Sequence, residues 1–406
     1  MQKSGLGNHG GCVLLFWLMA LTGGCAATPR GQVVCGIDVL ARDHFRVLEG
    51  RRVALITNQT GRDREGHRDA SLLAGAGNFK LVCLFSPEHG LYGNVDERIG
   101  NSVDSETGLK VYSLYGKTTR PTDAMLEGVD TLVFDIQDVG ARFYTYSATL
   151  GICMEEAARR KLKIIVLDRP NPVTGLTVDG PVADADHFGF TAYGPMPVMH
   201  GMTFGELARL YNDAWGIHAD LLIMPMQGWR RRMWFDQTGL PWVNPSPNLR
   251  NLTAATLYPA VCLLESTNVS VGRGTDRPFE QFGAPWMDGR KLAAALNVRH
   301  LPGLNFIPVE FTPQDSTFKG QTCQGVQVFL IDRERYKPMI SGVTIVWVIR
   351  QLYRDLFQLA KVERLLQNHQ AMVAIERAND PKNIEAVWQW SLTCFKELRS
   401  KYLIYN

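Results

Sequence analysis

Five short, continuous apolar runs constrain the fold more than any other feature of this sequence. They read RRVALIT, KLVCLFS, DTLVFDI, KLKIIVLD and ADLLIMPM, and they begin at residues 51, 80, 130, 161 and 219. Apolar runs of this length are typical of strands that are buried on both faces of a sheet. The segments between them are helix-like, namely DASLLAGAG, TDAMLEG, SATLGICMEEAARRK and TFGELARLYNDAWG. This alternation predicts βαβ units, and therefore a Rossmann-like parallel sheet with helices on both faces.

The texture of the chain changes from about residue 245. There NPSPNLRNL precedes a long stretch rich in Gly and polar residues at 265–286, ESTNVSVGRGTDRPFEQFGAPW. An irregular segment of that length is uncommon in a compact domain unless it lines a site. KLAAALN, GVQVFLIDRER, the helical TIVWVIRQLYRDLFQLA and WQWSLTCFKELRSKYLIYN follow it. We therefore expect a Rossmann-like domain at 36–250 and a smaller α/β domain at 251–406, with the 265–286 loop in an interdomain cleft.

Residues 1–25 have the composition of a targeting segment. Lys3 is followed by the apolar run VLLFWLMAL and by small residues before Cys25. The apolar run is too short to span a bilayer. LTGGC resembles a bacterial lipoprotein signal, in which the cysteine is acylated and becomes the mature N-terminus. Ordinary secretory cleavage near Ala26 or Ala27 is the alternative, and both predict an extracytoplasmic protein.

Composition excludes several partners and cofactors. The chain has 43 basic and 40 acidic residues, and the one Lys/Arg block, in WRRRMW, is short, so we expect no nucleic-acid partner. No G-x-G-x-x-G joins the first strand to its helix, which argues against a dinucleotide cofactor. The six cysteines after Cys25 show neither a C-x-x-C pair nor a zinc spacing. We therefore expect buried thiols, with one or two disulfide bridges as the alternative, no metal and no cofactor.

Polar side chains follow four of the five apolar runs. In an open parallel sheet, ligands bind in the crevice outside the carboxyl ends of the strands, so these side chains form a candidate site. Taken singly, each of them also suits a helix cap or a turn. The set comprises Asn58 and Gln59, then Glu88 and His89, then Asp135, Gln137, Asp138, Arg142, Tyr144 and Tyr146, and finally Asp168, Arg169 and Asn171.

Glu88 is the sharpest of these candidates. Pro87 stiffens the chain before it and Gly90 frees the chain after it. A carboxyl beside an apolar strand end is partly desolvated, and desolvation favours the protonated form that a general acid needs. The alternative is a surface Glu in a turn. We expect His89 to orient its neighbour.

Further candidates come from two later segments. His200 precedes MTFGE, which is typical of a helix capping box formed by Thr203 and Glu206. In the 265–286 segment two arginines stand among small residues, and a guanidinium grips a carboxylate with two parallel bonds, so a carboxylate-bearing ligand fits there. A salt bridge within the loop is the alternative. The candidate residues of this segment are Glu265, Asn268, Arg273, Thr275, Asp276 and Arg277.

From about Gly36 to Tyr405 the chain resembles the exo-acting β-N-acetylmuramidases, long known as a bacterial family of unknown function. The resemblance lies in ITNQTG, SPEHG, FDIQDVGARFYTY, LDRPNPVTG, HGMTFGELA, GLPWVNPSPN, ESTNVSVGRGTDRPFEQFGAPW and RSKYLIYN. It implies a Rossmann-like domain, a smaller α/β domain and an active site between them. It also implies release of N-acetylmuramic acid from the non-reducing end of peptidoglycan fragments, with Glu88 of SPEHG as the catalytic residue. In DGPVADADHFGF the chain departs from the family, so the loop from Asp184 to His187 is expected to differ in its substrate contacts.

Glycoside cleavage requires an acid for the leaving oxygen and a group that stabilises an oxocarbenium-like centre. Glu88 suits the first role. Asp135, Asp138, Glu265 or the substrate's own 2-acetamido group suits the second. The lactyl carboxylate of muramic acid suits Arg142, Arg273 or Arg277.

Two functions from other classes remain open at this stage. The first is a lipid-anchored protein that binds muropeptides without catalysis, which the two domains and the targeting segment suit equally well. The second is a hydrolase that uses His89 or His200 with a hydroxyl nucleophile, although no G-x-S-x-G elbow is present.

Overall fold

A seven-stranded sheet forms the centre of the larger part of the protein. The computed structural model describes residues 33–377 and 380–406, so the predicted targeting segment and Cys25 lie outside the described residues. The strand order is β3-β4-β2-β1-β5-β6-β9, and all neighbours are parallel except β3 and β4. The five predicted strands and their parallel pairing are confirmed. The strands are β1 (Arg52–Thr57), β2 (Lys80–Ser86), β3 (Ser102–Val103), β4 (Lys110–Ser113), β5 (Thr131–Asp135), β6 (Lys163–Leu167) and β9 (Asp220–Met224).

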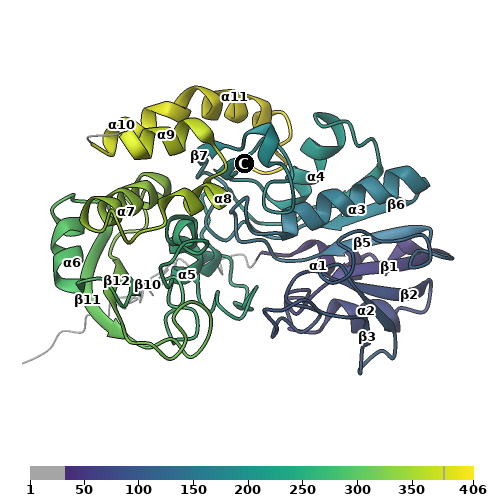
Figure 1. The fold of residues 1–406 in the computed structure, drawn as a ribbon. Helices are drawn as coiled ribbons and strands as arrows, with labels where there is room; N and C mark the ends of the chain where they lie inside the picture. Colours follow the sequence, from purple (N-terminus) through teal and green to yellow (C-terminus); the bar gives the residue numbers. More distant parts are fainter. Residues whose placement is uncertain (1–32, 378–379) are drawn as a thin grey trace, which may run out of the picture. The chain divides into compact units, whose positions relative to one another are not determined.

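Helices cover both faces of this sheet, as predicted. Alternate residues of β1 belong to different apolar clusters: Val53 and Leu55 pack in one, and Ala54 and Ile56 in the other. Helices α1 and α2 lie on the first face, and α3 and α4 on the second; Figure 1 shows the strands one below another from β6 to β3, with α3 beside β6 and α2 beside β2. Burial on both faces explains why the strands read as continuous apolar runs. The helices are α1 (Gly36–Arg42), α2 (Asp69–Gly75), α3 (Tyr146–Arg160) and α4 (Phe204–Asp213).

Two local predictions about this region had different outcomes. The capping box of α4 is confirmed, because Thr203 Oγ1 accepts the backbone N–H of Glu206 and the Glu206 carboxylate accepts that of Thr203. The predicted helix in TDAMLEG is wrong, since this segment forms only turns. Gly128, the last residue of the segment, adopts a left-handed φ of +70°, and the few residues before it are too short a stretch to repay the cost of helix nucleation.

A smaller antiparallel sheet of order β10-β12-β11 organises the second region. Helix α6 packs on β11 and β12, and α7 packs on α5, which confirms a smaller α/β region. Two predictions fail here: β10 lies inside the segment expected to be irregular, and the helix expected to reach Ala360 ends at Leu352, where Tyr353 turns away to pack on Trp286. The elements are α5 (Leu252–Val261), β10 (Gln281–Ala284), α6 (Gly289–Asn297), β11 (Leu304–Phe311), β12 (Cys323–Leu330) and α7 (Pro338–Leu352).

The end of the chain returns to the large sheet. Tyr405 donates its hydroxyl hydrogen to Asp168, directly after β6, and accepts the backbone N–H of Met226. In the described part of the chain, no helix is long and apolar enough to cross a membrane. The remaining elements are β7 (Asp179–Val182), β8 (Pro197–Met199), α8 (Glu363–Leu366), α9 (His369–Arg377), α10 (Lys382–Glu385) and α11 (Gln389–Ser400).

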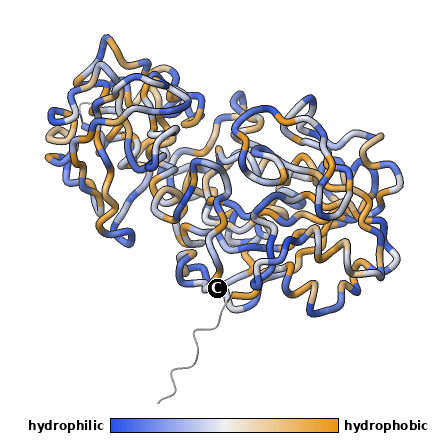
Figure 2. The backbone as a smooth tube through the Cα atoms, turned by 90° about the horizontal axis from the view of Figure 1, so that it is seen from below, coloured by the Kyte–Doolittle hydropathy of each residue, from blue (hydrophilic) through white to orange (hydrophobic). Residues whose placement is uncertain are grey.

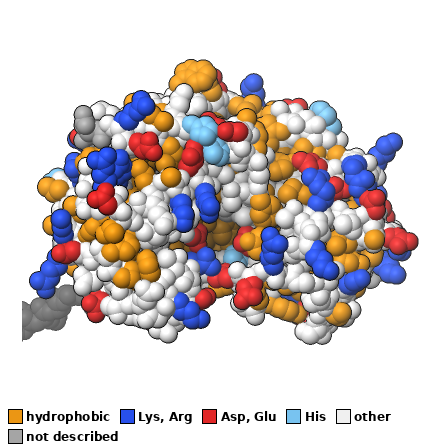
Figure 3. Space-filling view, in the orientation of Figure 1, with side chains coloured by type: hydrophobic (Ala, Val, Ile, Leu, Met, Phe, Trp, Pro, Cys, Tyr) orange, Lys and Arg blue, Asp and Glu red, His pale blue; other side chains and the backbone are white. Residues whose placement is uncertain are grey.

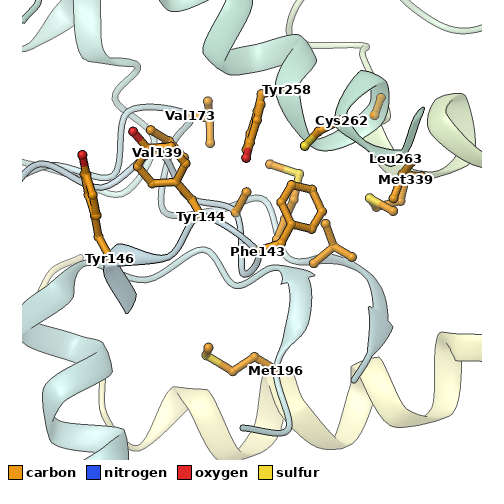
Figure 4. Packing of buried hydrophobic residues seen from close by; sticks show 14 of the residues in the cluster. Val139, Phe143, Tyr144, Tyr146, Val173, Met196, Tyr258, Cys262, Leu263 and Met339 are labelled. Carbon is orange, nitrogen blue, oxygen red and sulfur yellow. The ribbon is translucent and has the colours of Figure 1, made fainter. Parts of the chain in front are cut away.

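One apolar core joins the loop after β5 to helix α5. Figure 4 shows Phe143, Tyr144 and Tyr258 facing one another there, and their rings meet edge to face with centroids 5.4 and 5.9 Å apart. Figure 2 shows hydrophobic stretches alternating with hydrophilic ones along the whole described backbone. Six cysteines of the described chain are free and five of them are buried, as the sequence predicts. This core fixes the floor on which the polar pocket described below is built.

Candidate active site

A polar pocket opens beyond the carboxyl end of β2, where the 246–279 region meets the large sheet. Its volume is about 320 Å³, which lies within the range of small-molecule sites. Figure 3 shows a hollow in which acidic, basic and histidine side chains gather. The predicted site residues Glu88, His89, Tyr144, Glu265 and Arg273 line the pocket, together with Asp96, Tyr115, Phe143, Thr145, Phe190, Thr191, Ser246, Asn248, Tyr258, Phe279 and Leu365.

Glu88 stands on a tight turn at the end of β2. The carbonyl of Pro87 accepts the backbone N–H of Gly90, and both His89 and Gly90 are left-handed, with φ of +69° and +74°. Gly adopts that conformation without strain, whereas His does not. The turn therefore directs Glu88 and His89 out of the sheet and into the pocket, and Glu88 is half-buried.

Two hydroxyl groups hold the carboxylate of Glu88. Thr145 Oγ1 donates to Glu88 Oε2 over 2.5 Å, and Thr145 stands just before α3. The second is Tyr115, which hydrogen-bonds to the same carboxylate; burial and this neighbouring charge raise the pKa of Tyr115 to about 12. The ring of Tyr115 stacks on Phe190, with centroids 6.0 Å apart. Glu88 thus has a fixed position in a partly apolar setting.

A chain of alternating charges crosses the pocket beside Glu88. His89 Nδ1 lies 3.0 Å from both the carbonyl of Val95 and Asp96 Oδ1. Arg273 donates to Asp96 Oδ2 over 2.9 Å and to Glu265 Oε1 over 2.7 Å. Burial opposes ionisation of Asp96, but His89 and Arg273 outweigh it and lower the pKa of Asp96 to about 2. The chain links loops that are more than 170 residues apart.

The arginine at the centre of this chain is ionised and partly accessible. Burial would lower the pKa of Arg273, yet Glu265 and Asp96 raise it above the ordinary value. Its side chain is 26% exposed, and no hydrogen-bond partner of its Nε is found among the described residues. Asn248 donates to Asp96 over 2.7 Å and completes the network. The wall offers charged groups of both signs to a ligand.

Asp135 and Asp168 were both predicted for the site. They are instead buried at the carboxyl ends of β5 and β6. Asp135 is fully buried and grips the guanidinium of Arg169 with both oxygens, one of them 2.8 Å from Nη2. Asp168 accepts from Thr203 Oγ1 over 2.7 Å and from Tyr405 over 2.6 Å, and burial raises its pKa to about 7. Neither carboxylate lines the pocket. Both bond only to groups of the protein interior, so we infer that they stabilise the fold.

Arg142, Asp138 and His200 are also sealed. The guanidinium of Arg142 donates to four backbone carbonyls, those of residues 181, 196, 365 and 366, and burial lowers its pKa to about 9. Asp138 Oδ2 lies 3.3 Å from His200 Nε2, and both side chains are buried. The expectation that Arg142 reads a lactyl carboxylate is therefore not met, because its side chain is fully buried and both of its Nη atoms donate to backbone oxygens.

The other predicted residues hold loops around the pocket or lie apart from it. Gln59 Nε2 and the Tyr146 hydroxyl both donate to the carbonyl of Pro245, and Asn58 Oδ1 accepts from Thr60. Gln137 and Arg169 line a separate cavity of about 30 Å³. The remainder make local bonds or are exposed outside the pocket: Asn171 and Asn268 bind backbone carbonyls, Thr275 binds the carbonyl of Gly272, and Asp276 and Arg277 are exposed.

Sequence reasoning missed several pocket residues. Asp96, which joins His89 to Arg273, lies in LYGNVDERIG, a loop without a strand or motif to mark it. Thr145 and Asn248 lie inside stretches that were already noted, FDIQDVGARFYTY and NPSPN, and their place in those stretches was the available signal. No comparable signal pointed to Asp96 or Tyr115.

Comparisons with known proteins agree with this geometry. The family models of exo-beta-N-acetylmuramidase NamZ match the chain, the N-terminal model at residues 53–253 and the C-terminal model at 256–405. The chain is 41% identical over 381 residues to the peptidoglycan beta-N-acetylmuramidase NamZ of Bacillus subtilis, covering 93% of this chain and 92% of that protein.

Two crystal structures of DUF1343 family proteins from Bacteroides fragilis have the same fold. One has a TM-score of 0.86 at 36% identity and covers 93% of this chain and 100% of its own. The other has a TM-score of 0.76 at 31% identity and covers 92% of this chain and 99% of its own. Together with the two family models, which span nearly all of the described residues, these similarities show that the chain belongs to the exo-β-N-acetylmuramidase NamZ family of glycoside hydrolases.

Proposed function

We propose that this protein hydrolyses peptidoglycan fragments such as MurNAc-GlcNAc from the non-reducing end and releases N-acetylmuramic acid, with Glu88 as the general acid. One observation carries the proposal: Glu88 is the half-buried carboxyl that the turn after β2 projects into the pocket. Thr145 holds one of its oxygens, so its orientation is set before the substrate binds. Protonated Glu88 gives its proton to the bridging oxygen as the bond from that oxygen to the anomeric carbon breaks.

The positive charge that develops at the sugar ring requires a counter-charge. Of the three carboxylates expected for this role, Asp135 and Asp138 are sealed, and only Glu265 lines the pocket. Arg273 donates to Glu265 over 2.7 Å and so fixes the position of its carboxylate in the pocket wall. We assign the stabilising role to Glu265, and the substrate's 2-acetamido group is the competing candidate.

Arg273 is also our candidate for reading the lactyl carboxylate of muramic acid. Of the three arginines considered, Arg142 is sealed and Arg277 lies outside the pocket lining, whereas Arg273 lines it. Its side chain is 26% exposed, whereas its Nε, which neither Asp96 nor Glu265 uses, is shielded from solvent, so a ligand would meet the other atoms of the guanidinium. Asp96 and Glu265 already offset the charge of Arg273. The lactyl carboxylate would therefore gain binding energy mainly from a directed hydrogen bond and less from net electrostatic attraction.

Two further proposals concern the targeting segment and the division into domains. The composition of residues 1–25 supports an extracytoplasmic protein, anchored through a lipid on Cys25. Mass analysis of the mature N-terminus tests this, and an unmodified Cys25 overturns the anchor. Residues of both 36–250 and 251–406 line the pocket, which supports the proposal that two domains with these bounds build the site together.

Replacing Glu88 by Gln tests the mechanism. We expect turnover of MurNAc-GlcNAc to fall by about 10²- to 10⁴-fold, because Gln keeps the shape of the side chain but has no proton to give. Thermal unfolding and binding of the disaccharide should change little. The matched control is Glu97→Gln, which alters an exposed Glu of the following loop and should leave the rate unchanged.

The outcome separates the enzyme from a non-catalytic binding protein. If Glu88→Gln and the unmodified protein turn over the disaccharide at similar rates, Glu88 is not the acid. If neither releases muramic acid although both bind the disaccharide, the protein captures muropeptides without cleaving them. Mass analysis of the products from defined muropeptides identifies the bond and the chain end attacked.

A further inference from the structure

Two histidines meet on the surface beside the pocket. His187 ends a short 3-10 helix, η2 (Ala185–His187), and His369 begins α9. Their rings lie 4.8 Å apart, although the two residues are 182 positions apart in the sequence, and His369 Nε2 lies 2.8 Å from Asp186 Oδ2. Figure 3 shows histidine and acidic side chains side by side above the hollow.

The donor atoms of this cluster suit a zinc-like ion. One donor atom from each of Asp186, His187 and His369 lies within 4.8 Å of the others. In a tetrahedral site with bonds of 2.0–2.2 Å, donor atoms stand about 3.4 Å apart, so closure requires shifts of about 1 Å. Asp186 and His369 are largely exposed, and rotation of such side chains suffices.

A second observation concerns His187 itself. Its Nε2 is shielded from solvent and has no hydrogen-bond partner among the described residues. The nearest acid, Glu363, lies 3.6 Å away, which is beyond hydrogen-bond distance. A shielded ring nitrogen without a partner has lost its water without replacement, and this cost is recovered if the nitrogen binds a ligand.

The partner of His369 completes the resemblance to a metal site. Glu363 Oε1 lies 2.5 Å from His369 Nδ1 and Asp186 Oδ2 lies 2.8 Å from Nε2, so each ring nitrogen donates a hydrogen to a carboxylate. A metal ion would displace the hydrogen on Nε2 and leave the bond from Nδ1 to Glu363 in place. Histidines that bind metals almost always donate their other ring N–H to a carboxylate or carbonyl, which fixes the tautomer. Glu363 occupies that supporting position.

We propose that Asp186, His187 and His369 bind a divalent transition-metal ion of the zinc type, with Glu363 orienting His369 and water filling the remaining position. Two imidazoles and one carboxylate form a ligand set that zinc accepts in open sites. The loop of Asp63, Glu65 and His67 also groups three donors, but it offers one histidine, already bound to Asp63 within the same loop. That loop supplies the control.

The ion would tie together two segments that form the rim of the pocket. The backbone N–H of Asp184 already donates to Gln367, and Gln367 donates to Thr191, which lines the pocket. Phe190 and Leu365, on the same two segments, also line it. This expectation rests on the proposed function. We expect the ion to lower KM for the disaccharide and to leave kcat unchanged, because it would order the rim of the pocket and would not contact Glu88.

Metal titration of the full chain tests the site directly. After dialysis against a chelator, we expect one equivalent of zinc to bind in calorimetry, and one equivalent of Co²⁺ to give the intense visible bands of a four-coordinate site. His187→Ala and His369→Ala should each weaken binding at least tenfold, and Glu363→Gln by about 10- to 100-fold. His67→Ala should bind as the unmodified protein does.

Zinc should raise Tm for the unmodified protein and for His67→Ala, but not for the two rim variants, since an ion stabilises only a state that binds it. Equal Tm values of all variants in chelator show that they fold. Absence of saturable binding, or equal binding by all variants, overturns the site. The titration does not depend on hydrolysis, so loss of the proposed activity leaves this result readable.

Discussion

Two arginines, each gripped by carboxylates, stand at the carboxyl end of the large sheet and have opposite surroundings. Arg169 is 7% exposed and pairs with the fully buried Asp135. Arg273 is 26% exposed in its side chain and pairs with Asp96 and Glu265 on the pocket wall. The first pair is buried at the carboxyl ends of β5 and β6, and the second lines the pocket. Charged residues near strand ends therefore fall into two groups, buried ion pairs and partly exposed pocket residues, and only their solvent exposure distinguishes the two.

The difference follows from what covers the end of each strand. Asp135, at the end of β5, is held by Arg169, and Tyr405 and the capping residue Thr203 cover Asp168 directly after β6. Glu88, beyond the end of β2, lies instead in the pocket beside Glu265 and Arg273. Burial is expensive for an ion unless its bonds are complete, so the covered Asp135 and Arg169 form a tightly bonded pair, whereas the charged side chains of the pocket wall stay partly exposed.

The largest effect is expected from removing the sealed arginine. Arg169→Met leaves Asp135 buried without its partner, and breaking such a pair costs about 3 to 5 kcal/mol of unfolding free energy. Urea unfolding measures it. The exposed Arg277→Met is the control and should stay within about 0.5 kcal/mol. A loss below 1 kcal/mol for Arg169→Met would show that the two arginines are alike in energetic terms.

The second effect is a difference in pH dependence between two aspartates. Burial raises the pKa of Asp168 to about 7, so between about pH 4 and 7 the folded state holds a proton that the unfolded state has lost. The contribution of Asp168 to stability therefore falls as pH rises through that window, by on the order of 4 kcal/mol. Asp168→Asn removes this slope. Stability of the two proteins in urea, compared at pH 4.5 and 7.5, measures it.

Asp96 provides the contrast to Asp168. Its pKa is lowered to about 2, so its contribution is complete above about pH 4 and is lost only as pH falls toward 2. Between pH 4.5 and 7.5, Asp96→Asn should therefore remove no slope that the ionisation of Asp96 produces. Equal slopes for Asp96→Asn and Asp168→Asn contradict the distinction between pocket and sealed carboxylates.

The sequence predicted the sheet because apolar runs are local, and it predicted Glu88 because Pro87 and Gly90 mark the turn within a few residues. It did not predict Asp96, because that side chain acquires its role from Arg273, 177 positions away. For the same reason it placed Asp135 and Arg142 in the site: their partners, Arg169 and the carbonyls near residue 365, become neighbours only in the folded chain. Local pattern specifies elements, whereas exposure is a property of the tertiary structure.

The smallest effect is expected from Arg273→Lys, and it appears in activity rather than in stability. Lysine keeps the charge but has no fork, so it cannot hold Asp96, Glu265 and a lactyl carboxylate together. We expect kcat/KM for MurNAc-GlcNAc to fall about tenfold, equivalent to about 1.4 kcal/mol, with less than 1 kcal/mol lost in unfolding.

A disaccharide with a plain hydroxyl in place of the lactyl ether completes this test. If Arg273 reads the lactyl group, the unmodified protein uses the plain sugar poorly and Arg273→Lys lowers that rate very little further. An equal fall on both sugars assigns Arg273 to orienting Glu265 and Asp96 alone. In that case Arg169 and Arg273 would differ in solvent exposure but not in function, since both would only hold carboxylates of the protein in place.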